Sequence, residues 1–293
     1  MINVITKCKI IIVILLIYFI ILKLRFVYVN NYVNGEVKNE LDSIFSKIDD
    51  SLPESDNTIP KILFQTYFDK DRIPEKVTQN IETYAKDYKR FLFDDNDALL
   101  FLYENFGCVF VEKFKKLSLG AHKADLLRYC FLYVYGGVYI DIKTELFVDL
   151  SSVIDHNKNR LYTVTCYYND WRLNLSEFSL HQGFIAVPPK NFIIKELIYK
   201  FMYIHSFFIN LPFRFNYLTF CKQFYQLVSK YTNVKYLKSS VYDTNHHDFT
   251  IELFKEVNNC SSGQKRNVYF WCIEIQDKNN NLLMNCRYPD FPW

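Results

Sequence analysis

An unbroken apolar run, IIIVILLIYFIIL, occupies residues 10–22. Its 13 residues are fewer than the roughly 20 that cross a bilayer, but apolar residues at 26–29 extend it. Lys23 and Arg25, which lie between, can direct their charged ends toward the polar interface. No small-x-small cleavage site follows, which disfavours a cleaved signal peptide. The pattern therefore predicts an uncleaved membrane anchor over residues 1–29, with its orientation left open by basic residues on both sides.

Residues 30–58 are mostly polar and rich in Asn, Ser and Asp. An amphipathic patch interrupts them at Leu41, Ile44, Phe45 and Ile48. This composition predicts a stem that holds a following domain away from the membrane. The same residues could equally form a first helix packed on that domain.

From residue 59 to the end, short apolar segments alternate with helical patterns, which predicts one α/β domain over 59–293. The first part reads as a buried parallel strand near 59–67, a helix over 74–88 and a second strand at 91–93. Residues 94–96 are expected to be the turn and N-cap of a helix that starts near residue 97. Farther along, the pattern predicts a helix at 217–230 and a hairpin formed by 268–275 and 282–286.

The stretch from 119 to 150 combines a helix, a glycine turn and a strand. Residues 121–135 have a helical apolar pattern, and the Gly136-Gly137 pair supplies a left-handed stop. Residues 138–140 read as a buried strand with Asp141 at its carboxyl end. In open α/β sheets, ligands collect at the carboxyl ends of strands, so Asp141 is a candidate site residue. By the same argument, the strand near 59–67 delivers Gln65, Thr66 and Tyr67 to a candidate loop.

Asp125 and Arg128 are three residues apart, so both project from one side of the predicted helix. A surface ion pair at this spacing would contribute little to stability. Their setting favours a functional interpretation, because this strongly apolar helix leads into a glycine turn and a strand that ends in an acid.

Composition excludes two other classes of function. The formal charge is +3, but four of the 35 basic residues precede the first acid, Glu36, which leaves 31 basic against 32 acidic residues. A nearly neutral domain predicts no nucleic-acid surface. The eight cysteines are scattered without a CxxC pair, which argues against a zinc site.

The candidate residues suit the chemistry of a sugar nucleotide. Its diphosphate needs positive charge, commonly from a divalent cation held by carboxylates. Its hydroxyls can be oriented by carboxylate and guanidinium groups. Asp141 could therefore serve a metal or the ribose, while Asp125 and Arg128 could hold the donor sugar.

The motifs that contain these residues resemble those of the DXD-type sugar transferases of glycosyltransferase family 32. That family includes yeast Golgi mannosyltransferases, α-1,4-glycosyltransferases, and capsular and viral sugar transferases. The resemblance is clear over roughly 59–150 and weaker to 200. It is carried by four segments: Ile59-Pro60-Lys61-Ile62 with Gln65-Thr66, Ala124-Asp125-Leu126-Leu127-Arg128-Tyr129, Gly136-Gly137-Val138-Tyr139-Ile140-Asp141, and Gln182-Gly183-Phe184-Ile185-Ala186-Val187-Pro188-Pro189.

The resemblance implies a GT-A fold, which is Rossmann-like, and transfer of a sugar from a UDP- or GDP-sugar to a glycan or glycolipid hydroxyl with retention of configuration. It further implies Mn²⁺ or Mg²⁺ as cofactor and a single-pass type II topology in a Golgi-like membrane, with the catalytic domain in the lumen. It gives Asp125 and Arg128 contacts to the donor sugar and makes Asp141 the first acid of DXD. Gln65, Thr66 and Tyr67 are expected near the nucleotide, and Gln182 near the donor.

Two departures from the family pattern leave alternatives open. Lys143 stands where the second acid of DXD is expected, and Gln182 replaces an Asn. Either a metal is retained through Asp141, with Glu145 turned inward to help, or the Lys143 ammonium neutralises the diphosphate itself. The C-terminal histidine segment of the family is only faintly matched by Asn245-His246-His247-Asp248. A non-catalytic relative that binds glycan or sugar nucleotide is the alternative function.

The apolar run generates a direct prediction about the N-terminus. Residues 1–29 should remain on the mature protein and hold it in membranes, and their deletion should release a soluble, folded protein. Fractionation of full-length and truncated protein, with N-terminal sequencing of the native form, checks this. A native N-terminus near residue 30 would contradict it.

Overall fold

The computed structural model describes residues 35, 37–54, 56–170, 175–204, 219–246, 248–259 and 273–288. Chain contacts divide it after Lys47 into two units, 1–47 and 48–293. Residues 37–51 are helical. The predicted anchor at 1–29 lies outside the described residues. Among the helices that are described, none has the length and apolar character needed to cross a membrane.

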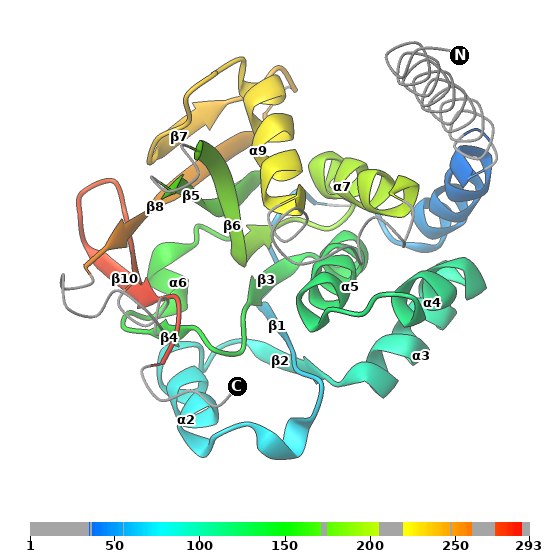
Figure 1. Cartoon of the computed structure of the whole chain (residues 1–293), viewed down its shortest axis with the longest axis horizontal. Coiled ribbons are helices and arrows are strands. Elements are labelled where there is room, and N and C mark those ends of the chain that lie inside the picture. The colour runs from blue at the N-terminus through cyan, green and yellow to red at the C-terminus, as the bar shows by residue number, and fades with distance from the viewer. Residues whose placement is uncertain are drawn as a thin grey trace, which may run out of the picture. The chain divides into compact units, whose positions relative to one another are not determined.

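Residues 48–293 form a mixed α/β structure, as the alternating pattern predicts (Figure 1). Its elements, in chain order, are β1 (Ile62–Thr66), η1 (Lys70–Arg72), α2 (Glu75–Tyr84), β2 (Lys89–Phe93), α3 (Asp95–Phe106), α4 (Cys108–Lys115), α5 (Gly120–Tyr135), β3 (Gly137–Ile140), β4 (Glu145–Leu146), α6 (Leu150–Val153), β5 (Arg160–Asp170), β6 (Leu175–Val187), α7 (Phe192–Tyr203), α9 (Thr219–Thr232), β7 (Ser240–Asp243), β8 (Thr250–Asn258), β9 (Ile273–Gln276) and β10 (Leu282–Asn285).

The described strands form one sheet in the order β2-β1-β3-β6-β5-β8-β9-β10-β4, with β7 paired to β8. β1 runs parallel to both β2 and β3, which confirms the parallel strand predicted near 59–67. β3 and β6 are antiparallel, and β6 continues antiparallel to β5. The predicted helix near 217–230 appears as α9, and the late hairpin as β9 and β10.

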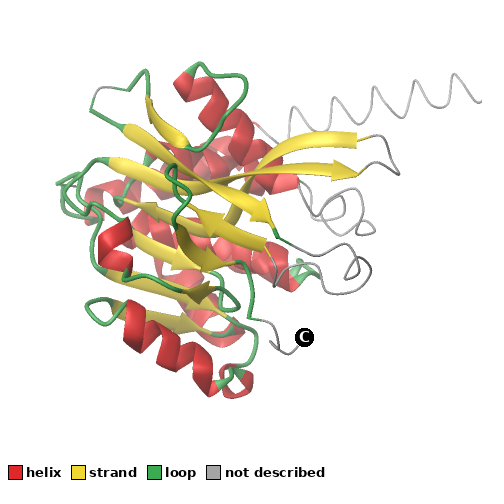
Figure 2. Cartoon of the chain, turned by 90° about the vertical axis from the view of Figure 1, so that its left-hand side faces the viewer, coloured by secondary structure: helices red, strands yellow, loops and turns green. Residues whose placement is uncertain are grey.

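Alternation of side chains along β1 and β3 separates two apolar layers, so that helices pack on both faces of the sheet (Figure 2). On one face, the Phe64 ring stacks on Phe131 of α5 with centroids 4.0 Å apart. On the other face, Leu63, Val138 and Ile140 join a buried cluster that includes residues of α2 and α6. The short apolar strand β1 therefore contributes side chains to both layers, because its consecutive residues face opposite sides of the sheet.

Local capping explains where α3 begins. Asp94 is the N-cap, and its side chain accepts from the backbone N–H groups of Asn96 and Asp97. The Asp97 carboxylate in turn accepts from the Asp94 backbone N–H. This capping box satisfies amide groups that the first helical turn leaves unpaired. The predicted N-cap is confirmed at Asp94, whereas residues 95 and 96 already belong to the helix, which starts two residues earlier than expected.

The Gly136-Gly137 pair turns the chain directly from α5 into β3. Both residues have positive φ, 62° and 92°, a conformation that favours glycine. A Cβ atom on Gly137 would lie 2.6 Å from the Ile62 carbonyl oxygen of β1. The pair therefore permits both the reversal and the close approach of β1 to β3, which brings the end of β3 beside α5.

We expect Gly137→Ala to lower the free energy of unfolding by about 2 kcal/mol or more, since left-handed backbone alone costs a non-glycine residue roughly 1–2 kcal/mol. Urea unfolding measures the change. Gly120→Ala is the matched control, because a Cβ at Gly120 meets nothing within 4 Å and its φ is not positive. Equal stability of the two variants would contradict the interpretation.

Candidate functional site

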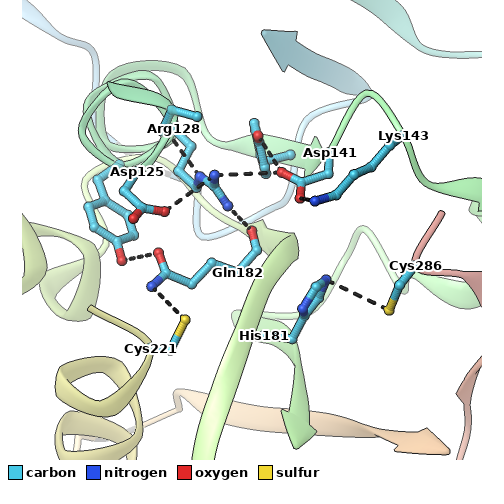
Figure 3. Close-up of polar contacts among 11 residues, drawn as sticks. Asp125, Arg128, Asp141, Lys143, His181, Gln182, Cys221 and Cys286 are labelled. Atoms are coloured by element: carbon cyan, nitrogen blue, oxygen red, sulfur yellow. Dashed lines mark hydrogen bonds and ion pairs between the residues drawn. The ribbon is translucent and has the colours of Figure 1, made fainter. Parts of the chain in front are cut away.

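Three elements bring the candidate residues together. Asp125 and Arg128 lie one turn apart on α5, Asp141 directly follows β3, and Gln182 lies in β6 (Figure 3). The Asp141 backbone N–H donates to the Gly183 carbonyl at 2.8 Å, so the sheet ladder sets the spacing between the last two elements. The predicted grouping of the helix pair with the acid at the strand end is therefore present.

Arg128 joins the three elements through its guanidinium. Nη2 lies 3.3 Å from Asp125 Oδ1 and 3.5 Å from Asp141 Oδ1. Nε donates to the Ala124 carbonyl at 3.1 Å, and Nη1 donates to the Gln182 carbonyl. The guanidinium also lies over the Tyr139 ring, 4.3 Å from its centroid. Arg128 is only 4% exposed, so this is a buried ion-pair group and differs from the surface pair that its spacing alone allows.

The two carboxylates of the group have opposite pKa shifts. Burial raises the pKa of Asp125 to about 6, although Arg128 acts to lower it. Burial also acts to raise the pKa of Asp141, but Arg128 and Lys143 outweigh it and hold the pKa well below its ordinary value. The Tyr139 hydroxyl, which donates to Asp141 Oδ1 at 2.7 Å, adds to this effect. Asp141 therefore carries a fixed negative charge, while Asp125 titrates near neutrality.

Gln182 occupies an irregular part of β6. The pairing of β5 with β6 shifts register between Tyr162 and Val164, opposite residues 181–186 of β6. The Tyr129 hydroxyl donates to the Gln182 amide oxygen, and the amide nitrogen lies 3.4 Å from Cys221 Sγ. With the amide turned over, its nitrogen would instead donate to Asp125 Oδ1 at 3.2 Å. In both orientations Gln182 lies against α5, as a bulge that redirects a side chain allows.

The candidate nucleotide residues Gln65, Thr66 and Tyr67, at the end of β1, have contacts different from those of the Arg128 group. Gln65 is fully buried, and its amide oxygen accepts from Arg90 Nε of β2 at 2.9 Å. The Thr66 hydroxyl donates to the Phe93 carbonyl at 3.1 Å. Tyr67 packs beside a small cluster that contains Ile142, the residue after Asp141. Of these three, Tyr67 is thus the one that the structure places next to the turn after β3, and the nucleotide role of all three stays a prediction.

Sequence reasoning missed three contributors to the site. Tyr139 could have been found, because residues two apart on a strand share a face and Tyr139 precedes Asp141 by two. His181 gave no such signal, yet burial lowers its pKa to about 4, so its imidazole is neutral at pH 7 beside Asp141. Gly183 is needed for close approach, since a Cβ there would lie 2.3 Å from His181 Nε2 and 3.0 Å from Asp141 Oδ2.

The side chains around Asp141 do not fit the expected Mn²⁺ or Mg²⁺. Such ions prefer several oxygen ligands, whereas Asp141 already lies between Arg128 at 3.5 Å and Lys143 Nζ at 3.7 Å. Glu145, the proposed helper, lines a hollow with Lys76, Gln79 and Asn80. In the described part of the chain, no group of three His, Cys, Asp or Glu side chains is arranged to hold a metal. The donor set therefore disagrees with the cofactor that the DXD resemblance implies.

Of the two histidines in the weakly matched segment, the structure describes His246. The His246 ring stacks on Phe192 of α7, with centroids 4.0 Å apart, and also packs near Tyr231 of α9. His247 lies outside the described residues. The exposed His246 ring thus packs against side chains of two helices.

The raised pKa of Asp125 generates a prediction about stability. The folded state favours protonated Asp125, and this preference stabilises the protein. The stabilisation is complete below about pH 4 and is lost as the pH rises through about 6. The rise in the pKa of Asp125 from its ordinary value of 3.8 to about 6 corresponds to about 3 kcal/mol. We expect the unfolding free energy of the wild type to fall relative to Asp125→Asn over this window, as measured by urea unfolding. Parallel pH profiles would contradict it.

Comparisons with known proteins place these residues in a recognised region. Residues 62–160 match the family model described as "Glycosyltransferase sugar-binding region containing DXD motif". That range includes Asp125, Arg128, Asp141 and Lys143.

Two similar proteins come from Saccharomyces cerevisiae. Mannosyl phosphorylinositol ceramide synthase SUR1 is 38% identical over 93 residues, which cover 31% of this chain and 24% of that protein. Initiation-specific alpha-1,6-mannosyltransferase is 28% identical over 137 residues, which cover 43% of this chain and 28% of that protein. The chain thus spans about a quarter of the length of these two relatives.

Among solved structures, PaToxG Glycosyltransferase aligns with 66% of this chain and 77% of its own, at 18% identity and a TM-score of 0.41. That score is too low to show a shared fold. The assignment therefore depends on the sequence match and on the site that lies inside it. Residues 62–160 of this chain are thus similar to the sugar-binding region of DXD-type glycosyltransferases.

Proposed function

We propose that this protein is a glycosyltransferase that moves a sugar from a nucleotide-sugar donor to a hydroxyl of a glycan or glycolipid. One observation carries the proposal: the buried Arg128 links Asp125 and Asp141 inside the region that matches a sugar-binding family model. We further propose that the sheet β2-β1-β3 is the nucleotide-binding part of a GT-A fold, with the donor at the carboxyl ends of its strands.

In this proposal, α5 holds the donor sugar. Asp125 accepts hydrogen bonds from sugar hydroxyls, and Arg128 donates to sugar or phosphate oxygens, both as charge-assisted bonds. The bonds from Arg128 to Ala124 and Gln182 hold the guanidinium in one orientation before the donor arrives. Such preorganisation lowers the activation barrier because the site does not reorganise as charge develops on the leaving group. Retention of configuration is proposed from the family resemblance.

The transferred sugar is proposed to be a hexose, with mannose the first candidate, because the two yeast relatives are named for mannosyl transfer. We propose a UDP- or GDP-linked donor. A panel of such donors, assayed for transfer and for hydrolysis, identifies it. Release of nucleoside diphosphate supports the enzyme, whereas binding without turnover of any donor would favour a non-catalytic relative.

The location of the protein is proposed from its first 29 residues. Their apolar run and the Golgi-type family resemblance support a single-pass type II protein in a Golgi-like membrane, with the catalytic domain in the lumen. Epitope mapping with protease protection, at each end of the chain, tests that orientation.

The central ion-pair group leads to a catalytic prediction. Asp125→Asn and Arg128→Ala should each lower kcat/KM by roughly 10²–10³, about 2–4 kcal/mol, because each removes a charged contact to the donor in the transition state. Steady-state kinetics with the donor identified above measures the loss. Arg128→Lys should fall between, since lysine keeps the charge but loses the planar guanidinium.

A solvent-exposed ion pair provides the matched control. Lys61 and Asp87 are 3.6 Å apart with side chains about half exposed, and their replacement by Ala and Asn should leave kcat/KM unchanged. Circular dichroism and thermal unfolding confirm that the variants fold. Near-wild-type kinetics in folded Asp125→Asn and Arg128→Ala would show that the pair is structural.

A further inference from the structure

We infer that Lys143 provides the positive charge for the donor diphosphate that two acids and a divalent cation provide in a complete DXD motif. The inference rests on the proposed function, because it names how that same site meets its donor. It grows from the disagreement between the expected metal and the side chains that surround Asp141.

The backbone after β3 places the ammonium at the site. Residues 141–144 form a turn, closed by the Thr144 N–H donating to the Asp141 carbonyl at 2.9 Å. Within this turn, Lys143 Nζ lies 3.7 Å from Asp141 Oδ2 (Figure 3). The turn thus brings the ammonium to the carboxylate. Lys143 thus occupies the space where a metal ligand of Asp141 would lie.

The segment that follows β10 fixes this turn. The Tyr288 N–H donates to the Lys143 carbonyl at 2.9 Å, and the Tyr288 ring packs with Ile142 in a buried cluster. The lysine backbone is therefore held from two sides, by the turn and by the segment after β10. Its side chain remains 31% exposed, so the ammonium can reach a ligand while it stays beside Asp141.

The charges of the group balance without a metal. Asp125 and Asp141 contribute two negative charges when ionised, Arg128 and Lys143 contribute two positive charges, and His181 is neutral at pH 7. An aspartate at position 143 would change the local charge by two units toward negative. That difference equals the charge of one divalent cation. Lysine at this position therefore supplies electrostatically what the second acid and its metal would supply together.

A divalent cation at Asp141 would meet unfavourable surroundings. Both oxygens of the carboxylate face a cationic side chain, Oδ1 toward Arg128 and Oδ2 toward Lys143. A metal would have to displace at least one of them and would then be repelled by both. An anionic diphosphate, by contrast, is attracted by the same two groups. The arrangement favours an anion and disfavours a second cation.

The test measures binding of UDP and GDP by calorimetry in exhaustively chelated buffer, with and without added Mn²⁺. We expect the wild type to bind at least one of them in chelator, with a Kd that Mn²⁺ changes less than about threefold. Lys143→Ala should weaken this binding at least tenfold, and Lys143→Arg should retain it. Lys143→Asp should lose binding in chelator and regain it with Mn²⁺. Paramagnetic resonance of Mn²⁺ should then detect bound metal in Lys143→Asp but not in the wild type.

Lys61→Ala is the matched lysine control and should bind like the wild type. Wild-type binding that requires Mn²⁺, or unchanged binding by folded Lys143→Ala in chelator, would overturn the inference. Absence of binding under every condition would overturn both the inference and the proposed function. Metal-free, Lys143-dependent binding without sugar transfer would uphold the inference and reject the transferase, so the two failures are distinguishable.

Discussion

The ion-pair group around Arg128 is the constraint on which the rest of the site depends. A guanidinium that is 4% exposed would be strongly unfavourable without compensation, and Asp125 and Asp141 provide it from two different elements. Two carbonyl groups and the Tyr139 ring complete its surroundings. Because each carboxylate compensates part of this buried charge, α5 and the end of β3 must keep their relative position. The glycine turn between them makes that position possible.

The pKa values of the two carboxylates that share Arg128 differ because their other surroundings differ. Asp141 is contacted by Arg128, Lys143 and the Tyr139 hydroxyl, so ionisation is strongly favoured there. Asp125 pairs with Arg128 at 3.3 Å and is deeply buried, and this burial raises its pKa to about 6. Pairs of acids with divergent pKa values are typical of sites where one group binds and another exchanges a proton or hydrogen bond. The asymmetry thus suits a site that distinguishes anionic from hydroxyl-bearing parts of one ligand.

Lys143 extends this electrostatic design beyond the buried group. Arg128 is enclosed, whereas Lys143 reaches the same carboxylate from the solvent side. The turn that carries it is tied to the segment after β10, so the far end of the chain helps to form the site. The positive charge at the end of β3 therefore depends on the Lys143 side chain. It also depends on the backbone hydrogen bond from Tyr288, a residue more than a hundred positions later in the chain.

The sequence by itself determined features whose causes are local. The Asp94 cap, the glycine stop after α5, and the shared helical face of Asp125 and Arg128 follow from turn chemistry and from a period of 3.6 residues. Tertiary structure decided what local patterns cannot encode. Pairing with Arg90 drew Gln65 into the interior, and a register shift in β6 set Gln182 beside α5 and His181 beside Asp141. These outcomes depend on strand register and on partners distant in sequence, and no spacing within a single segment specifies either.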